Sequence, residues 1–200
     1  MDYNIRVYKV EKEGSDLRGF VSLTFEGQFC AKGIALKESK AGNLYLDLPR
    51  YQDYETKEYE DYFSVRDGNF RRELLENVKE AYETIEPEEK MADLECAWGD
   101  EELYYDLNVF PLTRNGDFKA EVSMKIQDVF VVRQMHVIKA WTGKMFVGMP
   151  QRENRTKAEM EDIAHPVDRE FKKELEKTIM DEYYKKIETI RQNSTKQVSR

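Results

Sequence analysis

The chain of 200 residues is long enough for one domain or two small ones, and its 40% hydrophobic content is sufficient for a packed core. No apolar run approaches the ~18 residues that cross a bilayer, and the charged, alternating N-terminus is unlike a signal peptide. Cys30 and Cys96 are too few for a disulfide framework, and a cytoplasmic protein of net charge −8 is therefore expected.

The chain contains an internal repeat, which determines the elements to expect. Residues 17–49 align without a gap with residues 118–150, at an offset of 101 positions. Identical pairs in the alignment include Val21 and Val122, Ser22 and Ser123, Phe29 and Phe130, Gly42 and Gly143, and Pro49 and Pro150. The repeat predicts four segments: a unit at 1–86, an acidic linker at 87–103, a second unit at 104–190 and a disordered polar tail at 191–200.

Each unit is expected to begin with four antiparallel strands, because short alternating segments are separated by turn signals such as Asn115-Gly116. In the first unit these segments are residues 4–12, 19–25, 29–37 and 44–49. In the second unit they are residues 105–114, 120–126, 130–139 and 145–150.

A polar loop of 16 residues, 51–66 in the first unit, is predicted to lead from the fourth strand to a helix. Asp67 and Asp168 are suited to cap these helices, because a short carboxylate accepts hydrogen bonds from the exposed amides of the first turn. Apolar residues then recur about every four positions, which places one stripe of each helix on a sheet. The stripes are Phe70, Leu74, Val78 and Tyr82, and Phe171, Leu175, Ile179, Tyr183 and Ile187.

The acidic linker is predicted to be partly helical. Pro87 is a suitable first residue for a short helix, and Gly99 is suitable to end it.

The second unit has a recognisable pattern over residues 107–187. After a hairpin, it has a strand beginning Phe130-Val131-Val132, a strand ending in Met149-Pro150, and the segment Asp-Ile-Ala-His-Pro at 162–166 before the helix. This pattern resembles the stage V sporulation protein G (SpoVG) family. The first unit resembles the family only through the repeat, since Asp-Tyr-Phe-Ser-Val stands at 61–65 in place of the motif.

The resemblance implies a bacterial cytoplasmic regulator linked to septation and sporulation, which binds DNA or RNA and has no enzymatic activity. Members of the family are homodimers whose sheets join between subunits. The expected fold class is therefore α+β, with two tandem units that each have a four-stranded antiparallel sheet and one C-terminal helix. We expect the two units to form a pseudo-dimer within the chain.

His165 allows two interpretations. With Asp162 it has the residue types of a catalytic base or a metal ligand, but a histidine metal site needs three or four ligands, and His136 is the only other histidine. No motif for a nucleophile or an oxyanion site accompanies it. We favour a structural corner in which His165 satisfies backbone groups, Pro166 ends the loop and Asp168 caps the helix. No cofactor or metal is expected.

Basic residues are concentrated in the second unit. Residues 107–200 have a net charge of +4, whereas residues 87–106 have −7 and residues 1–86 have −5. Several cations on one face bind phosphates by releasing counterions, although a solvated helix surface with interspersed glutamates explains the same pattern. The candidate nucleic-acid-binding residues are Arg133, Lys139, Lys144, Arg152, Arg155, Lys157, Arg169, Lys172, Lys173 and Lys177.

The function expected from sequence and resemblance is a non-enzymatic regulator that contacts nucleic acid mainly through the second unit. The alternative is a protein-protein interaction module that uses the acidic first unit and the linker.

Overall fold

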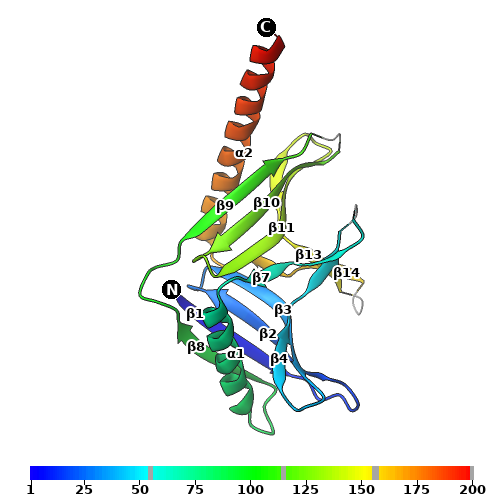
Figure 1. Ribbon diagram of the computed structural model, residues 1–200, viewed down its shortest axis with the longest axis vertical. Helices are drawn as coiled ribbons and strands as arrows, with labels where there is room; N and C mark the ends of the chain where they lie inside the picture. Colours follow the sequence, from blue (N-terminus) through cyan, green and yellow to red (C-terminus); the bar gives the residue numbers. More distant parts are fainter. Residues whose placement is uncertain (54–55, 114–115, 155–157, 199–200) are drawn as a thin grey trace.

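The computed structural model describes residues 1–53, 56–113, 116–154 and 158–198. Two units lie one above the other, each with a curved antiparallel sheet and a helix (Figure 1). The fold class, with two tandem α+β units that each end in a helix, is as predicted. Each sheet is larger than the four strands expected, because six strands form the first sheet and five form the second.

Within its described residues, the first unit contains eight strands and one helix. They are β1 (Asp2–Lys9), β2 (Leu17–Phe25), β3 (Phe29–Glu38), β4 (Leu44–Asp47), β5 (Arg50–Gln52), β6 (Tyr59–Asp61), β7 (Phe63–Val65), α1 (Gly68–Glu83) and β8 (Met91–Ala97). The second unit repeats this order up to its helix. Its elements are β9 (Tyr105–Pro111), β10 (Phe118–Ile126), β11 (Phe130–Lys139), β12 (Met145–Gly148), β13 (Gln151–Asn154), β14 (Glu159–Asp162), β15 (Ala164–Pro166) and α2 (Arg169–Val198).

The two units exchange a strand. The short strand β7 of the first unit pairs with β11 of the second, and β15 of the second unit pairs with β3 of the first. The exchange is possible because β4 pairs only with residues 35–38 of β3, which leaves residues 29–31 for β15. The sheets of the two units therefore join within the chain, as expected of a pseudo-dimer, although the exchange of these two short strands was not predicted.

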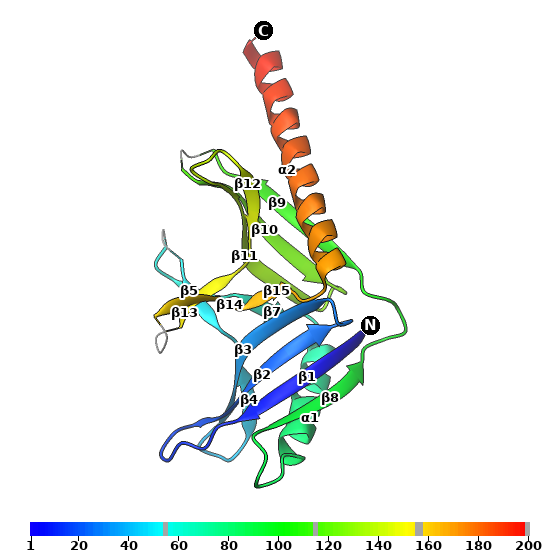
Figure 2. The ribbon, with the colours of Figure 1, turned by 180° about the vertical axis from the view of Figure 1, so that it is seen from behind.

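The prediction of a polar loop before each helix was wrong. In the first unit this segment forms the hairpin β5–β6 and then β7, and in the second it forms the hairpin β13–β14 and then β15. These strands have three or four residues each, which is too short for a clear alternation in the sequence. The hairpins project sideways from the two sheets in Figure 2.

The prediction of a helix in the linker was also wrong, because residues 91–97 form β8 and pair antiparallel with β1. The segment alternates, with Ala92, Leu94 and Cys96 packed against the core and the residues between them exposed. The alternating pattern of these seven residues therefore indicated their structure correctly, whereas the helix-start signal at Pro87 did not.

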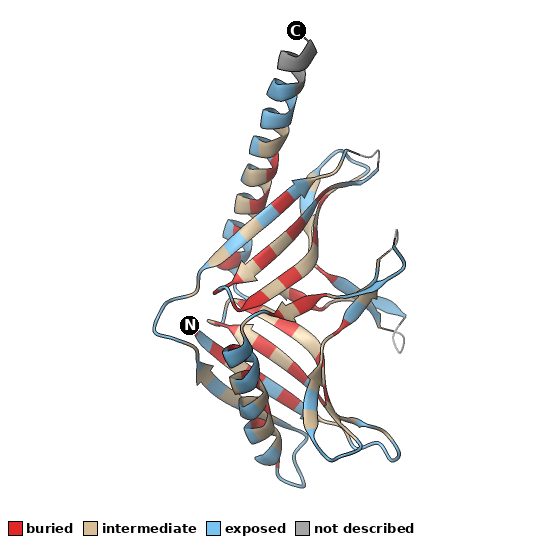
Figure 3. Ribbon diagram, in the orientation of Figure 1, coloured by how far each residue is buried: buried red, intermediate tan, exposed pale blue. Residues whose placement is uncertain are grey.

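Each helix covers the inner face of its own sheet, as the apolar stripes predicted. Asp67 accepts hydrogen bonds from the amides of Asn69 and Phe70, both at 2.8 Å, and Asp168 accepts one from Phe171 at 2.7 Å. Both predicted N-caps are thus confirmed. Figure 3 shows buried residues along the inner faces of the sheets and continuing through the junction between the units.

The helix α2 is longer than expected. The tail at 191–200 was predicted to be disordered, but residues 191–198 continue the helix, and residues 199–200 lie outside the described chain. Residues 188–198 contain neither glycine nor proline, so no strong signal ends the helix there. Its C-terminal part projects beyond the second sheet (Figure 2). Neither this helix nor α1 is long and apolar enough, over the part described, to cross a membrane.

Candidate nucleic-acid interface

A groove of about 860 Å³ lies where the outer face of the first sheet meets the β13–β14 hairpin of the second unit. Its lining comes from β1, β2, β3 and β5 of the first unit and from β13 and β14 of the second. Figure 2 shows these strands in the two units. The charged and aromatic side chains that line it are Arg6, Tyr8, Phe20, Lys32, Arg50, Arg152, Glu153 and Glu161. The exchange of strands therefore brings cations of both units to one surface.

A β-bulge shapes the floor of the groove at Lys32. Val21 pairs with Ile34 and Leu23 with Ala31, so Lys32 and Gly33 stand opposite the single residue Ser22. Gly33 takes a positive φ of +81°, a conformation that glycine adopts without strain. Bulges redirect side chains out of the regular ladder, and this one places Lys32 in the groove.

Arg152 reaches across the groove from β13 to this bulge. Its guanidinium nitrogens lie 3.1 and 3.2 Å from the position that a Cβ on Gly33 would occupy. The carboxylate of Glu161 on β14 pairs with the guanidinium at 3.0 Å, and hydrogen bonds from Arg152 and Asn154 lower the pKa of Glu161. Arg152, a predicted binding residue of the second unit, therefore lies over the sheet of the first unit.

The rest of the floor combines a cation with two aromatic rings. Arg6 binds Asp93 through two hydrogen bonds, of 2.7 and 3.2 Å, which raise the pKa of the arginine. Tyr8 and Phe20 are directly opposite each other on β1 and β2, with 44% and 40% of their surfaces exposed. An exposed pair of rings between cations is a suitable platform for stacking bases.

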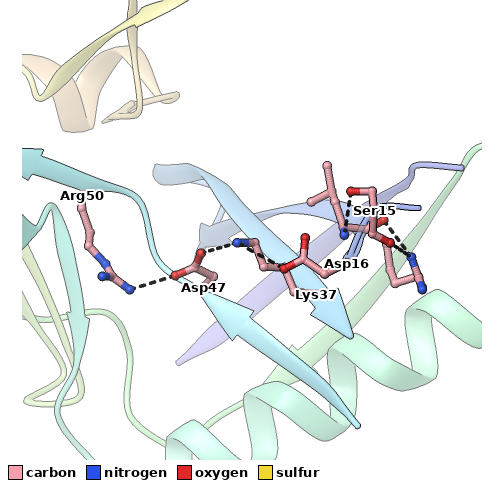
Figure 4. Close-up of polar contacts among 7 residues, drawn as sticks. Ser15, Asp16, Lys37, Asp47 and Arg50 are labelled. Carbon is pink, nitrogen blue, oxygen red and sulfur yellow. Dashed lines mark hydrogen bonds and ion pairs between the residues drawn. The ribbon is translucent and has the colours of Figure 1, made fainter. Parts of the chain in front are cut away.

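Arg50 lies at the edge of the groove and is held by Asp47 at the end of β4. Figure 4 shows Asp47 between Arg50, at 3.1 Å, and Lys37, at 2.9 Å. The hydrogen bond from Lys37 is the largest cause of a lowered pKa for Asp47. Asp16 approaches the same lysine at 3.8 Å but is 55% exposed.

We expect Asp47→Asn to reduce the free energy of unfolding at neutral pH by about 0.5–1 kcal/mol, the upper range for a partly exposed ion pair. Because the folded-state pKa of Asp47 is lowered, its stabilisation is present above the unfolded-state pKa and is lost as the pH falls through the folded value. Urea denaturation at about pH 7 and about pH 3 should show the difference from wild type shrinking in acid. Asp16→Asn is the control, and an equal loss in both variants would contradict the assignment.

His165 lies in β15, opposite Cys30 of the first unit, and not at the loop corner that we expected. Its Nδ1 is buried and has no hydrogen-bond partner among the described residues, so the expected contact with backbone groups is absent at that atom. Burial is the main cause of its lowered pKa, and the charges of Lys32 and Lys172 act in the same direction. The charge of Asp162 acts in the opposite direction.

The described residues contain no group of three or more histidine, cysteine, aspartate or glutamate side chains able to hold a metal ion.

The other predicted cations are spread over the second unit. Lys139 ends β11 and Lys144 is in the turn that follows, and both are exposed, whereas Arg133 is half-buried on β11. On α2, Arg169 is exposed and the lysines are paired with acids of the same helix. These pairs are Lys172 with Glu176 at 3.8 Å, Lys173 with Glu170 at 2.7 Å, and Lys177 with Asp181 at 2.7 Å. Arg155 and Lys157 lie outside the described residues.

Sequence reasoning missed the residues that the first unit supplies to the groove. These are Arg6, Tyr8, Phe20, Lys32 and Arg50. One signal was present, since the repeat aligns Lys32 with the predicted residue Arg133.

The second unit has an equivalent but smaller groove, of about 300 Å³. In the alignment of the units, Asn108 replaces Arg6, Glu121 replaces Phe20 and Tyr51 replaces Arg152. Burial and the neighbouring Glu60 raise the pKa of Tyr51 to about 12, so it adds no charge at neutral pH. The two grooves have diverged, and the larger one carries more cations.

Comparison with known proteins supports the duplication. The SpoVG family model matches residues 1–84 and again residues 104–185. A protein of Clostridium perfringens (strain SM101), called "Putative septation protein SpoVG", is 36% identical over 80 residues, which are 40% of this chain and 87% of the relative. Proteins of the same name from Clostridium novyi and Caldanaerobacter subterraneus are 37% and 38% identical over 78 and 80 residues. These alignments span 39% and 40% of this chain, and 76% and 86% of those relatives. With both of its units matched, the chain belongs to the SpoVG family.

Proposed function

We propose that this chain is a non-enzymatic regulator, linked to septation or sporulation, that binds single-stranded DNA or RNA in the groove between its first sheet and the β13–β14 hairpin. The observation that supports this most is the meeting of Lys32 and Arg152, one from each unit, beside the exposed rings of Tyr8 and Phe20. Neither unit alone supplies this combination.

In the proposed complex, the cations contact the nucleic-acid backbone and the aromatic rings contact the bases. Lys32, Arg50 and Arg152 bind phosphates, and the gain comes largely from released counterions. The present partners of Arg50 and Arg152 are partly exposed carboxylates, and exposed ion pairs contribute only about 0–1 kcal/mol, so a phosphate can replace them. Stacking on Tyr8 and Phe20 adds about 1–3 kcal/mol per base with little sequence preference.

The start of α2 extends the positive surface. Lys172 and Lys32 both act on His165, which is paired with Cys30 at the floor of the groove. The proposed interface therefore includes Lys172 of α2, one of the predicted helix cations.

Fluorescence anisotropy with labelled single-stranded DNA and RNA of random sequence tests the proposal. We expect the double variant Lys32→Glu/Arg152→Glu to bind at least about tenfold more weakly and to lose about one unit of salt slope per phosphate contact removed. The matched control is Lys139→Glu/Lys144→Glu, which changes the charge equally at exposed positions outside the groove and should keep most of the affinity.

Two outcomes contradict the proposal. One is a wild-type protein without affinity for DNA or RNA at low salt. The other is an equal loss of affinity in the groove and control variants, since that would reflect overall charge.

A second candidate function is protein binding at β8. This strand is at the end of the first sheet and carries the exposed acidic residues Asp93 and Glu95. An end strand offers free main-chain groups to another strand. Recovery of a host protein that depends on Glu95, without bound nucleic acid, would favour this function.

A further inference from the structure

A second cleft, of about 720 Å³, lies at the junction of the units, between the β5–β6 hairpin, β7, the start of α1 and β11. Four arginines line it: Arg50, Arg66, Arg71 and Arg133. Two carboxylates, Glu60 and Asp61, are present beside these four guanidinium groups, so the cleft keeps an excess of positive charge. Of the residues that the structure describes, Arg50 alone lines both this cleft and the proposed nucleic-acid groove.

The guanidinium groups use only part of their hydrogen-bonding capacity within the protein. Arg71 donates to the carbonyl of Val65 at 2.8 Å, and Arg133 donates to the carbonyl of Asp61 at a long 3.4 Å. Each guanidinium has five N–H donors in a planar fork. Both arginines are therefore held in place with donors left for an oxyanion.

Ser64 supplies a polar atom without a partner at the same place. Its Oγ is buried and has no hydrogen-bond partner among the described residues, although Ser64 lines the cleft. Ser64 pairs with Val131 on β11, so Arg133 is its diagonal neighbour on the same face of the sheet. Buried polar atoms without partners are rare in native proteins.

The same arrangement recurs in the other unit. The alignment places His165 on Ser64, Lys32 on Arg133 and Lys172 on Arg71. His165 Nδ1 is the second buried side-chain atom found without a partner in the described residues, and Lys32 and Lys172 are its cationic neighbours. In both units an unpartnered polar atom therefore lies in the exchanged strand, and cations occupy the matching positions of the unit's own helix and of the other unit's third strand.

We propose that the Ser64 cleft binds one phosphate group, with Arg71 and Arg133 as the principal ligands and the Ser64 hydroxyl as a further donor. We favour this cleft over the related position at His165, because guanidinium forks bind phosphate with two parallel hydrogen bonds whereas a lysine acts as a point charge. The phosphate comes either from a nucleic-acid backbone or from a free phosphorylated molecule. Binding of inorganic phosphate here does not depend on the proposed nucleic-acid groove.

Isothermal titration calorimetry with inorganic phosphate, at constant ionic strength in chloride, tests the site. We expect saturable binding that Arg133→Gln weakens by about tenfold or more and Ser64→Ala by about two- to tenfold. Because the Ser64 hydroxyl has no hydrogen-bond partner in the described part of the chain, Ser64→Ala should leave the urea midpoint unchanged or higher, so weaker binding would not reflect misfolding. The control Arg72→Gln, which removes the same charge at an exposed position of α1 outside both the cleft and the groove, should bind phosphate like wild type.

Competition identifies the source of the phosphate. If phosphate weakens binding of single-stranded nucleic acid, the cleft holds a backbone phosphate; if it binds without this effect, the ligand is a free phosphorylated molecule. Both results support the site. No saturable phosphate binding, or binding that is unchanged in Ser64→Ala and Arg133→Gln, overturns it. Neither of those two results bears on the groove, which the Lys32 and Arg152 variants test separately.

Discussion

Replacing Phe130 by alanine is expected to destabilise the whole chain by about 3–5 kcal/mol. Phe130 is fully buried at the start of β11, where the two units meet. Its ring centroid lies 5.1 Å from that of Phe25 and 5.6 Å from that of Phe63, both of the first unit. The substitution therefore removes packing that belongs to both sheets and leaves a cavity between them.

Urea denaturation followed by circular dichroism measures this effect, with Phe110→Ala as the control. Phe110 is on the second sheet but is 63% exposed, so its removal should change the free energy of unfolding by less than about 0.5 kcal/mol. Because the units exchange strands, we also expect one cooperative transition. Two separate transitions in the wild type, with only one shifted by Phe130→Ala, would show that the units are independent.

The sequence predicted those parts of the fold that depend on local pattern. The repeat located the two units, the spacing of Phe70 and Leu74 located a helix face, and Asp67 and Asp168 marked the helix starts. The caps and the stripes act within a few residues, and the repeat is read directly by comparing two stretches of the same chain.

What sequence reasoning missed depends on distant partners. The exchange of β7 and β15 involves strands of three residues whose partners lie in the other unit. The segment containing β8 carried both a helix start at Pro87 and an alternating pattern, and pairing with β1 decided between them. The candidate interface was located only in part, because Arg152 was assigned to the second unit and the structure places it over Gly33 of the first.

Because the two units are duplicated within one chain, the residues of their two related grooves can differ. In a symmetric homodimer both grooves have the same residues, but here Arg152 lies at one and Tyr51 at the other. The bulge that frames each groove persists, with Gly33 at φ +81° in the first unit and Gln134 at φ +63° in the second. The β-bulge is therefore retained in both units, whereas the side chains that line the groove above it differ.

Gly33→Val should therefore affect both stability and binding. A β-branched residue at a positive φ costs up to about 3 kcal/mol, and a Cβ at this position would contact the guanidinium of Arg152 at 3.1 Å. We expect a lower urea midpoint and, at temperatures where the variant is folded, weaker binding of single-stranded nucleic acid because Arg152 is displaced.

Gly27→Val separates these two effects. Gly27 also has a positive φ, of +62°, but a Cβ there would have no atom within 4 Å, so the backbone strain is similar and Arg152 is untouched. Gly27→Val should thus lose stability yet keep its affinity for nucleic acid. If both variants bind as wild type does, the position of Arg152 over the bulge has no part in binding. If both lose affinity equally, the loss follows from instability, and only a loss confined to Gly33→Val connects the bulge to the groove.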